Sequence, residues 1–281
     1  MKIKNSYLRA LVPPVVFLVM QAVVGLFFSL VVVVFHLASS GGDSSEQSLT
    51  PSVLALVIIL SGILSCLLLW RWKLIRIPEA FSCRRIGVPF WMIAVLAAML
   101  GIVSTDLMSE QLALPDLFGE QMKDMATNVF GVLAIALFGP IVEEVLFREG
   151  VQGILLRDGK KPWLAAVFSA LCFGLIHGNP AQIPFAFIVG LILAHIYERT
   201  RSIAVTSLIH ILNNSIAVLE INLLGEQVDG FRYDQFLGLE TWMVWTLIAV
   251  FALGCVGLLS RLKAVPQKSD ESPSAPTSFQ D

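Results

Sequence analysis

The segment GPIVEEVLFREG, residues 139–150, closes an apolar run that starts near residue 125 and is long enough to enter a bilayer. Within it lie two adjacent glutamates, Glu143 and Glu144, and an arginine, Arg148. Ionisable side chains at membrane depth cost several kcal/mol unless they are paired or used, so they mark a functional site by default. We therefore expect the rest of the chain to be arranged around this segment.

Composition places the chain among polytopic membrane proteins. Hydrophobic residues make up 56% and charged residues only 14% of the chain, and the mean hydropathy is +0.79, unlike a soluble domain. The net charge of -2 gives no sign of a nucleic acid partner. The four cysteines are scattered singly, without the Cys-x-x-Cys spacing of a thiolate metal site.

Eight apolar segments resemble transmembrane helices, so we predict an all-α polytopic fold with about eight spans. The first of them is too long for a signal-peptide core and is expected to remain in the protein. The predicted spans are residues 10–35, 52–70, 86–105, 125–147, 163–177, 183–197, 203–219 and 241–260.

Ionisable residues separate the predicted spans into a functional core and a group of outer helices. Spans one, two, three and eight contain none, whereas spans four to seven contain two glutamates and three histidines. The predicted units are residues 1–124 with spans one to three, residues 125–222 as a four-helix catalytic core, residues 223–264 with an outer loop and span eight, and residues 265–281 as a disordered cytoplasmic tail.

The distribution of basic residues predicts the orientation in the membrane. In an eight-span chain, only Lys123 and Arg232 of the 19 Lys and Arg residues fall on one side, where the loops are acidic. Positively charged loops face the cytoplasm. We therefore expect an integral protein of a bacterial plasma membrane with both termini in the cytoplasm.

Helical spacing separates the two glutamates of span four. Glu144 precedes Arg148 by four residues, the favourable order for an intrahelical ion pair. Glu143 is rotated by about 100° from that face and can point elsewhere. The alternative is an interfacial cluster in which the charged side chains extend to the membrane surface.

Two further pairs of residues lie four apart on apolar spans. Phe173 precedes His177 at the end of span five, and His210 precedes Asn214 in span seven. Taken singly, a histidine at a helix end is usually a capping or core residue, and His and Asn in transmembrane helices can simply join helices by hydrogen bonds.

In order along the chain, these residues form the motifs Glu-Glu-x-x-x-Arg, Phe-x-x-x-His and His-x-x-x-Asn. This combination resembles the CPBP intramembrane protease family, also called the Abi or type II CAAX-protease family, over roughly residues 125–220. The resemblance implies a membrane-embedded endopeptidase of eight helices whose cavity opens toward the cytosol, with Glu144, Arg148 and Phe173 in supporting roles. Glu149 stands where many members have glycine.

The motif residues fit peptide hydrolysis. Glu143 can be the base that activates water, with His177 sharing the water, while His210 and Asn214 supply donors to the oxyanion. A zinc ion held by Glu143, His177 and His210 is the alternative, although no His-Glu-x-x-His pair is present; no other cofactor is expected. The expected partners are the membrane and a peptide or membrane-anchored protein substrate, with no nucleic acid.

Two other functions stay open: a proton- or ion-coupled carrier that uses Glu143, His177 and His210 as a relay, and a non-catalytic scaffold.

The expected depths of His177 and His210 in the membrane conflict with their belonging to one site. His177 lies about 24 Å along its helix from Lys161, but His210 lies only about 13 Å from Arg201. We therefore expect span five to tilt and the turn at residues 178–184 to lie inside the protein, with substrate access from the cytosol.

Overall fold

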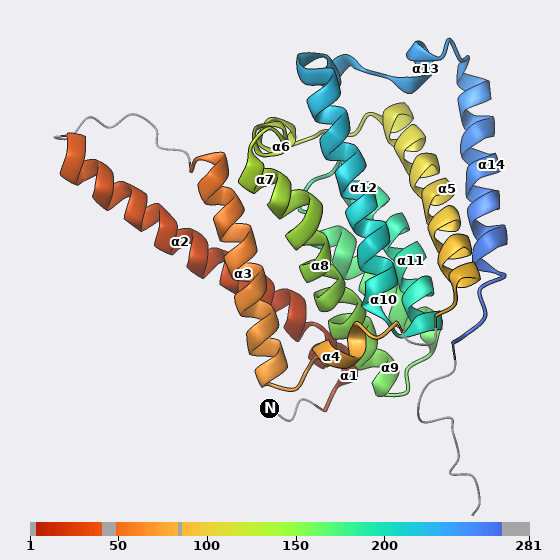
Figure 1. Ribbon diagram of the computed structural model, residues 1–281, viewed down its shortest axis with the longest axis horizontal. Helices are drawn as coiled ribbons and strands as arrows, with labels where there is room; N and C mark the ends of the chain where they lie inside the picture. Colours follow the sequence, from red (N-terminus) through yellow and green to blue (C-terminus); the bar gives the residue numbers. More distant parts are fainter. Residues whose placement is uncertain (1–3, 41–48, 84–85, 266–281) are drawn as a thin grey trace, which may run out of the picture.

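The computed structural model describes residues 4–40, 49–83 and 86–265, and in these ranges it contains helices but no strand (Figure 1). Seven segments are long and apolar enough to cross a membrane. The predicted class, a polytopic all-α membrane protein, is therefore confirmed. The predicted tail, apart from Val265, and most of the loop at residues 40–50 lie outside the described residues.

The full-length spans are formed by seven helical segments, one of them composite. They are α2 (Val12–Ser40) preceded by α1 (Ser6–Ala10), α3 (Pro51–Arg71), α5 (Val88–Leu112), the rod from α7 to α9, α11 (Ile183–Thr200), α12 (Ile203–Leu224) and α14 (Thr241–Leu259). Short helices connect them: α4 (Ile77–Ala80), α6 (Gly119–Ala126), η3 (Gly225–Gly230) and α13 (Tyr233–Phe236).

The remaining predicted span is too short to cross the membrane. Helix α10 (Pro162–Ile176) has 15 residues, which give about 22 Å of helix against a hydrocarbon core of about 30 Å. The prediction of about eight spans is corrected to seven full-length helices and α10 in the described part of the chain. Because α10 and α11 pack side by side as a hairpin, both ends of the hairpin still return to the same side.

The fourth span is a composite rod that begins and ends later than residues 125–147. Asn128 caps its start, because the Asn128 side chain accepts hydrogen bonds from the N–H groups of Phe130 and Gly131. The rod then runs through α7 (Val129–Leu133), η1 (Ala134–Phe138), α8 (Gly139–Glu144), η2 (Val145–Gln152) and α9 (Gly153–Arg157). It extends past residue 147 because the polar side chains there find partners inside the protein.

Two π-helical turns, η1 and η2, flank the glutamates of α8. At η1 the N–H of Gly139 donates to the carbonyl of Ala134, and a Cβ at Gly139 would lie 2.7 Å from that oxygen. Pro140 has no N–H, so the carbonyl of Ile135 finds no donor five residues further on. Such turns are common at functional sites, and they leave a backbone acceptor free for a side chain.

The segment η2 lies at the centre of the bundle. All of its residues are buried, and it contacts α2, α10, α11 and α12. The other strong packing contacts join α14 to α5 and α2 to α3. In the α10–α11 hairpin a Cβ at Gly174 would lie 2.8 Å from the Ile183 carbonyl, so only glycine permits this close approach.

Both described ends of the chain lie at the same end of the bundle, the lower end in Figure 1. Near the N-terminus Arg9 forms an ion pair with Asp158, which follows α9. Near the other end the N–H of Val265 donates to the carbonyl of Arg199 at 2.7 Å. Helices α6 and α13 lie at the opposite end of the bundle. The assignment of the lower end to the cytoplasm stays a prediction.

Candidate active site

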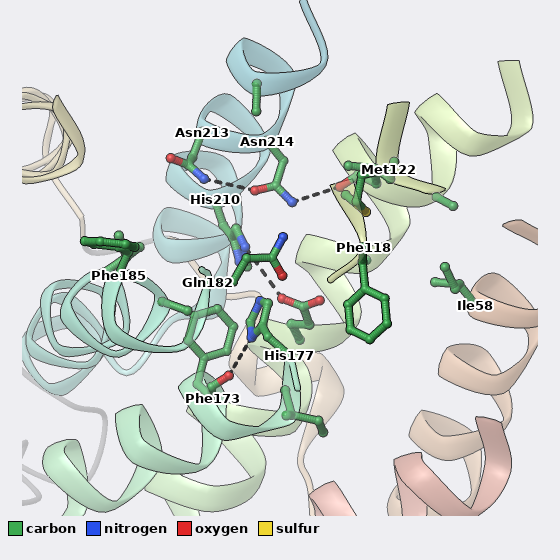
Figure 2. Close-up of a pocket in the computed structure, with 18 of the residues that line it drawn as sticks. Ile58, Phe118, Met122, Phe173, His177, Gln182, Phe185, His210, Asn213 and Asn214 are labelled. Atoms are coloured by element: carbon green, nitrogen blue, oxygen red, sulfur yellow. Dashed lines mark hydrogen bonds and ion pairs between the residues drawn. The ribbon is translucent and has the colours of Figure 1, made fainter. Parts of the chain in front are cut away.

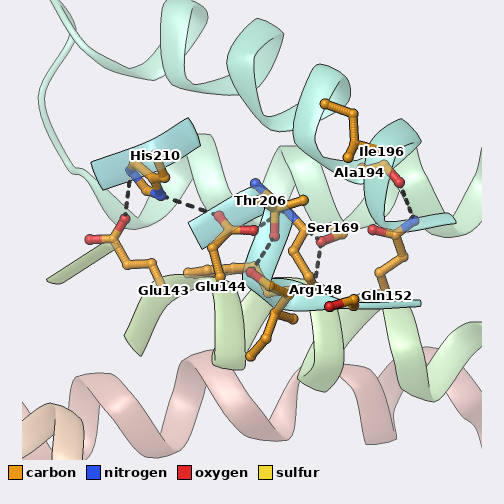
Figure 3. Close-up of polar contacts among 12 residues, drawn as sticks. Glu143, Glu144, Arg148, Gln152, Ser169, Ala194, Ile196, Thr206 and His210 are labelled. Carbon is orange, nitrogen blue, oxygen red and sulfur yellow. Dashed lines mark hydrogen bonds and ion pairs between the residues drawn. The ribbon is translucent and has the colours of Figure 1, made fainter. Parts of the chain in front are cut away.

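Glu144 and Arg148 form the predicted ion pair inside the protein. The Arg148 Nε atom lies 3.0 Å from Glu144 Oε2, and both side chains are 0% exposed. The guanidinium also donates to Ser169 Oγ at 3.4 Å, and that hydroxyl donates to the Phe147 carbonyl at 2.7 Å (Figure 3). Complete burial excludes the alternative in which this pair extends to the membrane surface.

Glu143 faces away from this ion pair, as the helical spacing predicts. Its side chain is 23% exposed, and it lines a cavity of about 710 Å³. The adjacent acids therefore occupy different environments: one carboxylate is neutralised by an arginine, and the other is open to a cavity.

His210 of α12 lies between the two carboxylates, an arrangement that the sequence did not predict. Its Nδ1 atom is 3.2 Å from Glu144 Oε1, and its Nε2 atom is 3.6 Å from Glu143 Oε2 (Figure 3). An ionised carboxylate only accepts hydrogen bonds, so Nδ1 is the donor to Glu144. The Nε2 edge of the ring is thereby turned toward Glu143 and the cavity.

His177 is oriented by its own helix. Its Nδ1 atom lies 2.8 Å from the Phe173 carbonyl (Figure 2). A carbonyl can only accept, so Nδ1 carries the proton and Nε2 carries a lone pair. His177 also lines the cavity, and it therefore brings a hydrogen-bond acceptor to the site.

Phe173 connects the three motifs through its ring. The ring centroid lies 5.0 Å from that of His177 and 5.6 Å from that of His210, both edge to face. The Arg148 guanidinium carbon lies 4.9 Å from the same centroid, a cation–π distance. Phe173 thus packs against one residue of each other motif and limits the rotation of both imidazoles.

Asn214 satisfies the backbone acceptor that the π turn leaves free. Its Nδ2 atom donates to the Ile135 carbonyl at 2.9 Å, and its Oδ1 atom accepts from Asn213 Nδ2 at 3.0 Å (Figure 2). Both contacts agree with one orientation of the amide. A side-chain amide has two N–H donors, so one of them remains for a ligand in the cavity, which Asn214 also lines.

All four residues predicted to be catalytic, namely Glu143, His177, His210 and Asn214, line this one cavity. The rest of its wall includes residues of α6 and of the turn after α10, but none of α1, α4 or α9. The cavity therefore extends toward the end of the bundle opposite the basic loops. Substrate access from the cytosol stays a prediction.

The conflict in depth between His177 and His210 is resolved by the turn that follows α10. Asn179 is fully buried there, whereas Gly178 and Pro180 are exposed, so the predicted burial of the turn holds for Asn179. Its amide donates to Asp116 Oδ1 at 2.8 Å and its Oδ1 accepts from the N–H of Leu117 at 3.2 Å. The segment after α5 thus holds the end of the short helix within the protein.

The predicted zinc donors do not fit a metal site in this geometry. Among the residues that the structure describes, no three His, Cys, Asp or Glu side chains gather closely enough to hold a metal ion. The Nδ1 atoms of both motif histidines bond to the Phe173 carbonyl and to Glu144, which leaves their Nε2 atoms on the side of the cavity. The chemistry below therefore uses the side chains of the chain alone.

Sequence reasoning missed several buried polar residues that support the site. Gln152 is fully buried and donates to the Ala194 carbonyl at 2.8 Å (Figure 3). Glu149 accepts from the Tyr197 hydroxyl and from Arg157, each at 2.6 Å. The only available signal was spacing, because Gln152 continues the polar face of the rod one turn after Arg148.

Fold and site together define a polytopic membrane protein with acids, histidines and an asparagine gathered at an internal cavity. Residues 125–216 match the family described as type II CAAX prenyl endopeptidase, Rce1-like. For this part of the chain the resemblance inferred from the three motifs is confirmed. The match contains Glu143, His177, His210 and Asn214.

Three bacterial proteins have the same sequence identity to this chain, over segments of different length. The chain is 27% identical over 88 residues to "Putative membrane peptidase YdiL" of Bacillus subtilis, covering 31% of this chain and 36% of that protein. It is 27% identical over 136 residues to "Membrane-embedded CAAX protease MroQ" of Staphylococcus aureus, covering 46% and 54%. It is 27% identical over 175 residues to an "Uncharacterized 24.3 kDa protein" of Escherichia coli, covering 57% and 76%. The chain thus spans about a third to a half of the first two relatives, and no solved structure matches it.

Proposed function

We propose that this protein is an intramembrane endopeptidase that hydrolyses a peptide bond in a membrane-associated peptide or protein. One observation carries the proposal: Glu143 is open to the cavity while its neighbour Glu144 is buried against Arg148 and His210. The match of residues 125–216 to a family of membrane endopeptidases supports the same function.

Glu143 and His177 activate the attacking water. Both present a hydrogen-bond acceptor to the cavity, the carboxylate of Glu143 and the Nε2 atom of His177. A water molecule that donates one proton to each of them directs a lone pair at the substrate carbonyl carbon. The Glu143 carboxylate takes the proton as the oxygen–carbon bond forms, which is general base catalysis.

His210 and Asn214 stabilise the oxyanion that forms on the substrate oxygen. The Nε2–H of His210 and the second N–H of the Asn214 amide are the two donors, and the bonds to Glu144 and Ile135 hold the two side chains in place. Fixed donors of this kind stabilise charge that develops in the transition state. Glu143 then returns its proton to the leaving amine as the carbon–nitrogen bond breaks.

Cleavage of peptides by the purified protein in detergent tests the proposal. We expect fragments from the wild-type protein and none from Glu143→Gln, with both proteins eluting as the same folded species. Detergent removes any ion gradient, so a proton- or ion-coupled carrier would be inactive in this assay. Uptake that requires a gradient, combined with no cleavage of any peptide, would favour the carrier.

A further inference from the structure

The cavity has a second carboxylate, far along the chain from the motif residues. Asp106 of α5 lines the same cavity as Glu143 and His177. Its side chain is exposed, and it forms no hydrogen bond or ion pair with any residue that the structure describes. The adjacent polar side chains of the wall include Thr105 and Ser109, whose hydroxyls donate to backbone carbonyls of their own helix.

The wall of the cavity has an excess of negatively charged side chains. Among the residues that the structure describes, this wall contains the carboxylates of Asp106 and Glu143 but no lysine or arginine. Glu110 and Glu220 lie close enough to Asp106 to add to the negative potential there. The nearby Arg232 is occupied, because it pairs with Asp234 at 2.6 Å and donates to the Glu110 carbonyl at 3.2 Å.

Asp106 presents an unpaired carboxylate to the cavity. A ligand that supplies the opposite charge is attracted to this carboxylate, and more strongly where the ligand and the cavity wall exclude water. Oxyanion stabilisation does not use Asp106, since its charge has the wrong sign. Within the cavity, the negative charge of Asp106 fits the binding of a cation.

We infer that Asp106 binds a positively charged group of the substrate, either a lysine or arginine side chain or a free N-terminal amine. This inference rests on the proposed peptidase function and names its substrate class: a peptide segment with a cation near the scissile bond. By the same electrostatics, a substrate whose free C-terminal carboxylate must lie at this end of the cavity is repelled.

The helix α12 gives the distance between the two subsites. Glu220, which interacts with Asp106, is ten residues beyond His210 on α12, and Ala217 of the cavity wall is seven residues beyond it. At 1.5 Å per residue these positions lie about 10 to 15 Å from the level of His210. An extended peptide covers about 3.3 Å per residue, so the cation should lie roughly three to five residues from the scissile bond.

A positional scan of charge tests the inference on the purified full-length protein. The probes are quenched-fluorescence peptides of one sequence, with lysine, norleucine or glutamate placed at each position in turn, and with free or acetylated N-termini. We expect lysine to raise kcat/KM about tenfold or more over norleucine at a position three to five residues from the cleaved bond. Acetylation removes the effect only if the N-terminal amine is the ligand.

The variant Asp106→Asn keeps the shape of the side chain and removes the charge, so the ratio of lysine to norleucine peptides should fall to about one. Glu120→Gln is the matched control, because Glu120 pairs with Lys123 on the surface and does not line the cavity; the ratio should persist there. A wild-type protein with no preference, or an Asp106→Asn protein that keeps the preference, would overturn the inference.

Binding measurements separate this inference from the proposed function. Fluorescence anisotropy with Glu143→Gln protein gives the Kd of labelled lysine and norleucine peptides without any turnover. Lysine-dependent binding that is lost on adding Asp106→Asn supports the cation subsite even if no peptide is cleaved. Cleavage without any charge preference in either assay supports the peptidase and rejects the role of Asp106.

Discussion

The amide of Asn214 donates to the carbonyl of Ile135, 2.9 Å away, and the residue five positions after Ile135 is Pro140, which has no N–H to offer. The side chain of α12 thus replaces a backbone hydrogen bond of η1. Asn214 therefore has a structural role in addition to its proposed catalytic role, and mutation can separate these two roles.

Asn214→Ala should lower turnover by about 10²- to 10³-fold, the usual effect of removing one oxyanion donor, and should also lower thermal stability because the Ile135 carbonyl loses its donor. Adding Pro140→Ala supplies a backbone N–H near that carbonyl. The double variant should regain stability in a thermal unfolding assay without regaining turnover. Recovery of both properties together would mean that Asn214 acts only through η1.

The two adjacent glutamates should respond differently to the same substitution. Glu144→Gln leaves Arg148 as an unpaired buried charge, which costs roughly 3 to 5 kcal/mol, so the folded yield should fall. Glu143→Gln should preserve yield and melting temperature and abolish cleavage. Size-exclusion profiles, melting curves and cleavage rates of the two variants provide the comparison. Equal yields and equal activities would contradict the division of roles.

Orientation in the membrane can be measured with single cysteines in a background without the four native ones. Cysteines at Glu120, after the start of α6, and at Lys161, before α10, should react with an impermeant thiol reagent from opposite sides of the membrane. Lys161 lies among the basic residues and should be labelled only after the cytoplasmic side is opened. Labelling of both positions in intact cells would overturn the predicted topology.

The same approach locates the mouth of the cavity. A cysteine at Gln121, which is exposed and lines the cavity, should react from the same side as one at Glu120. An excess of peptide substrate should slow the reaction at Gln121 and leave that at Glu120 unchanged. If substrate protects neither position, the peptide does not enter through this end of the cavity.

Metal removal distinguishes direct water activation from zinc catalysis. We expect chelators to leave cleavage nearly unchanged and elemental analysis of the wild-type protein to find no stoichiometric zinc, because no three His, Cys, Asp or Glu side chains of the described residues gather closely enough to hold a metal ion. A zinc enzyme would behave otherwise: His210→Ala would release the metal, and Asn214→Ala would keep near-normal turnover, since asparagine is not a usual zinc ligand.

Local spacing predicted the parts of this protein that depend on a single helix. The Glu144–Arg148 ion pair and the outward facing of Glu143 follow from positions four and one residues apart. Hydropathy located the seven full-length spans, although the third and fourth end 7 and 10 residues later than predicted. The bounds of α10 agree with the prediction to within one residue, but its 15 residues are too few for the full span that we predicted.

Contacts between segments that are distant in the sequence could not be predicted from it. No pattern in the sequence indicates that His210 lies between two carboxylates about 66 residues earlier, or that Asn179 meets Asp116. The partner of Asn214, the Ile135 carbonyl, could not be predicted either. This carbonyl is free only because η1 forms, and η1 depends on how Gly139 and Pro140 pack in the bundle. These contacts depend on tertiary packing, which a single sequence without its fold does not specify.

Helix α10 also determines how the protein meets its lipid surroundings. Trp163, Val167, Leu171 and Leu175 form an exposed apolar stripe along it, so this short helix faces acyl chains. A helix of about 22 Å beside a hydrocarbon layer of about 30 Å is a hydrophobic mismatch, which the bilayer relieves by becoming thinner locally. For the proposed endopeptidase, a peptide that approaches along α10 would cross less hydrocarbon than elsewhere, so the rate of cleavage should depend on acyl-chain length in the host membrane.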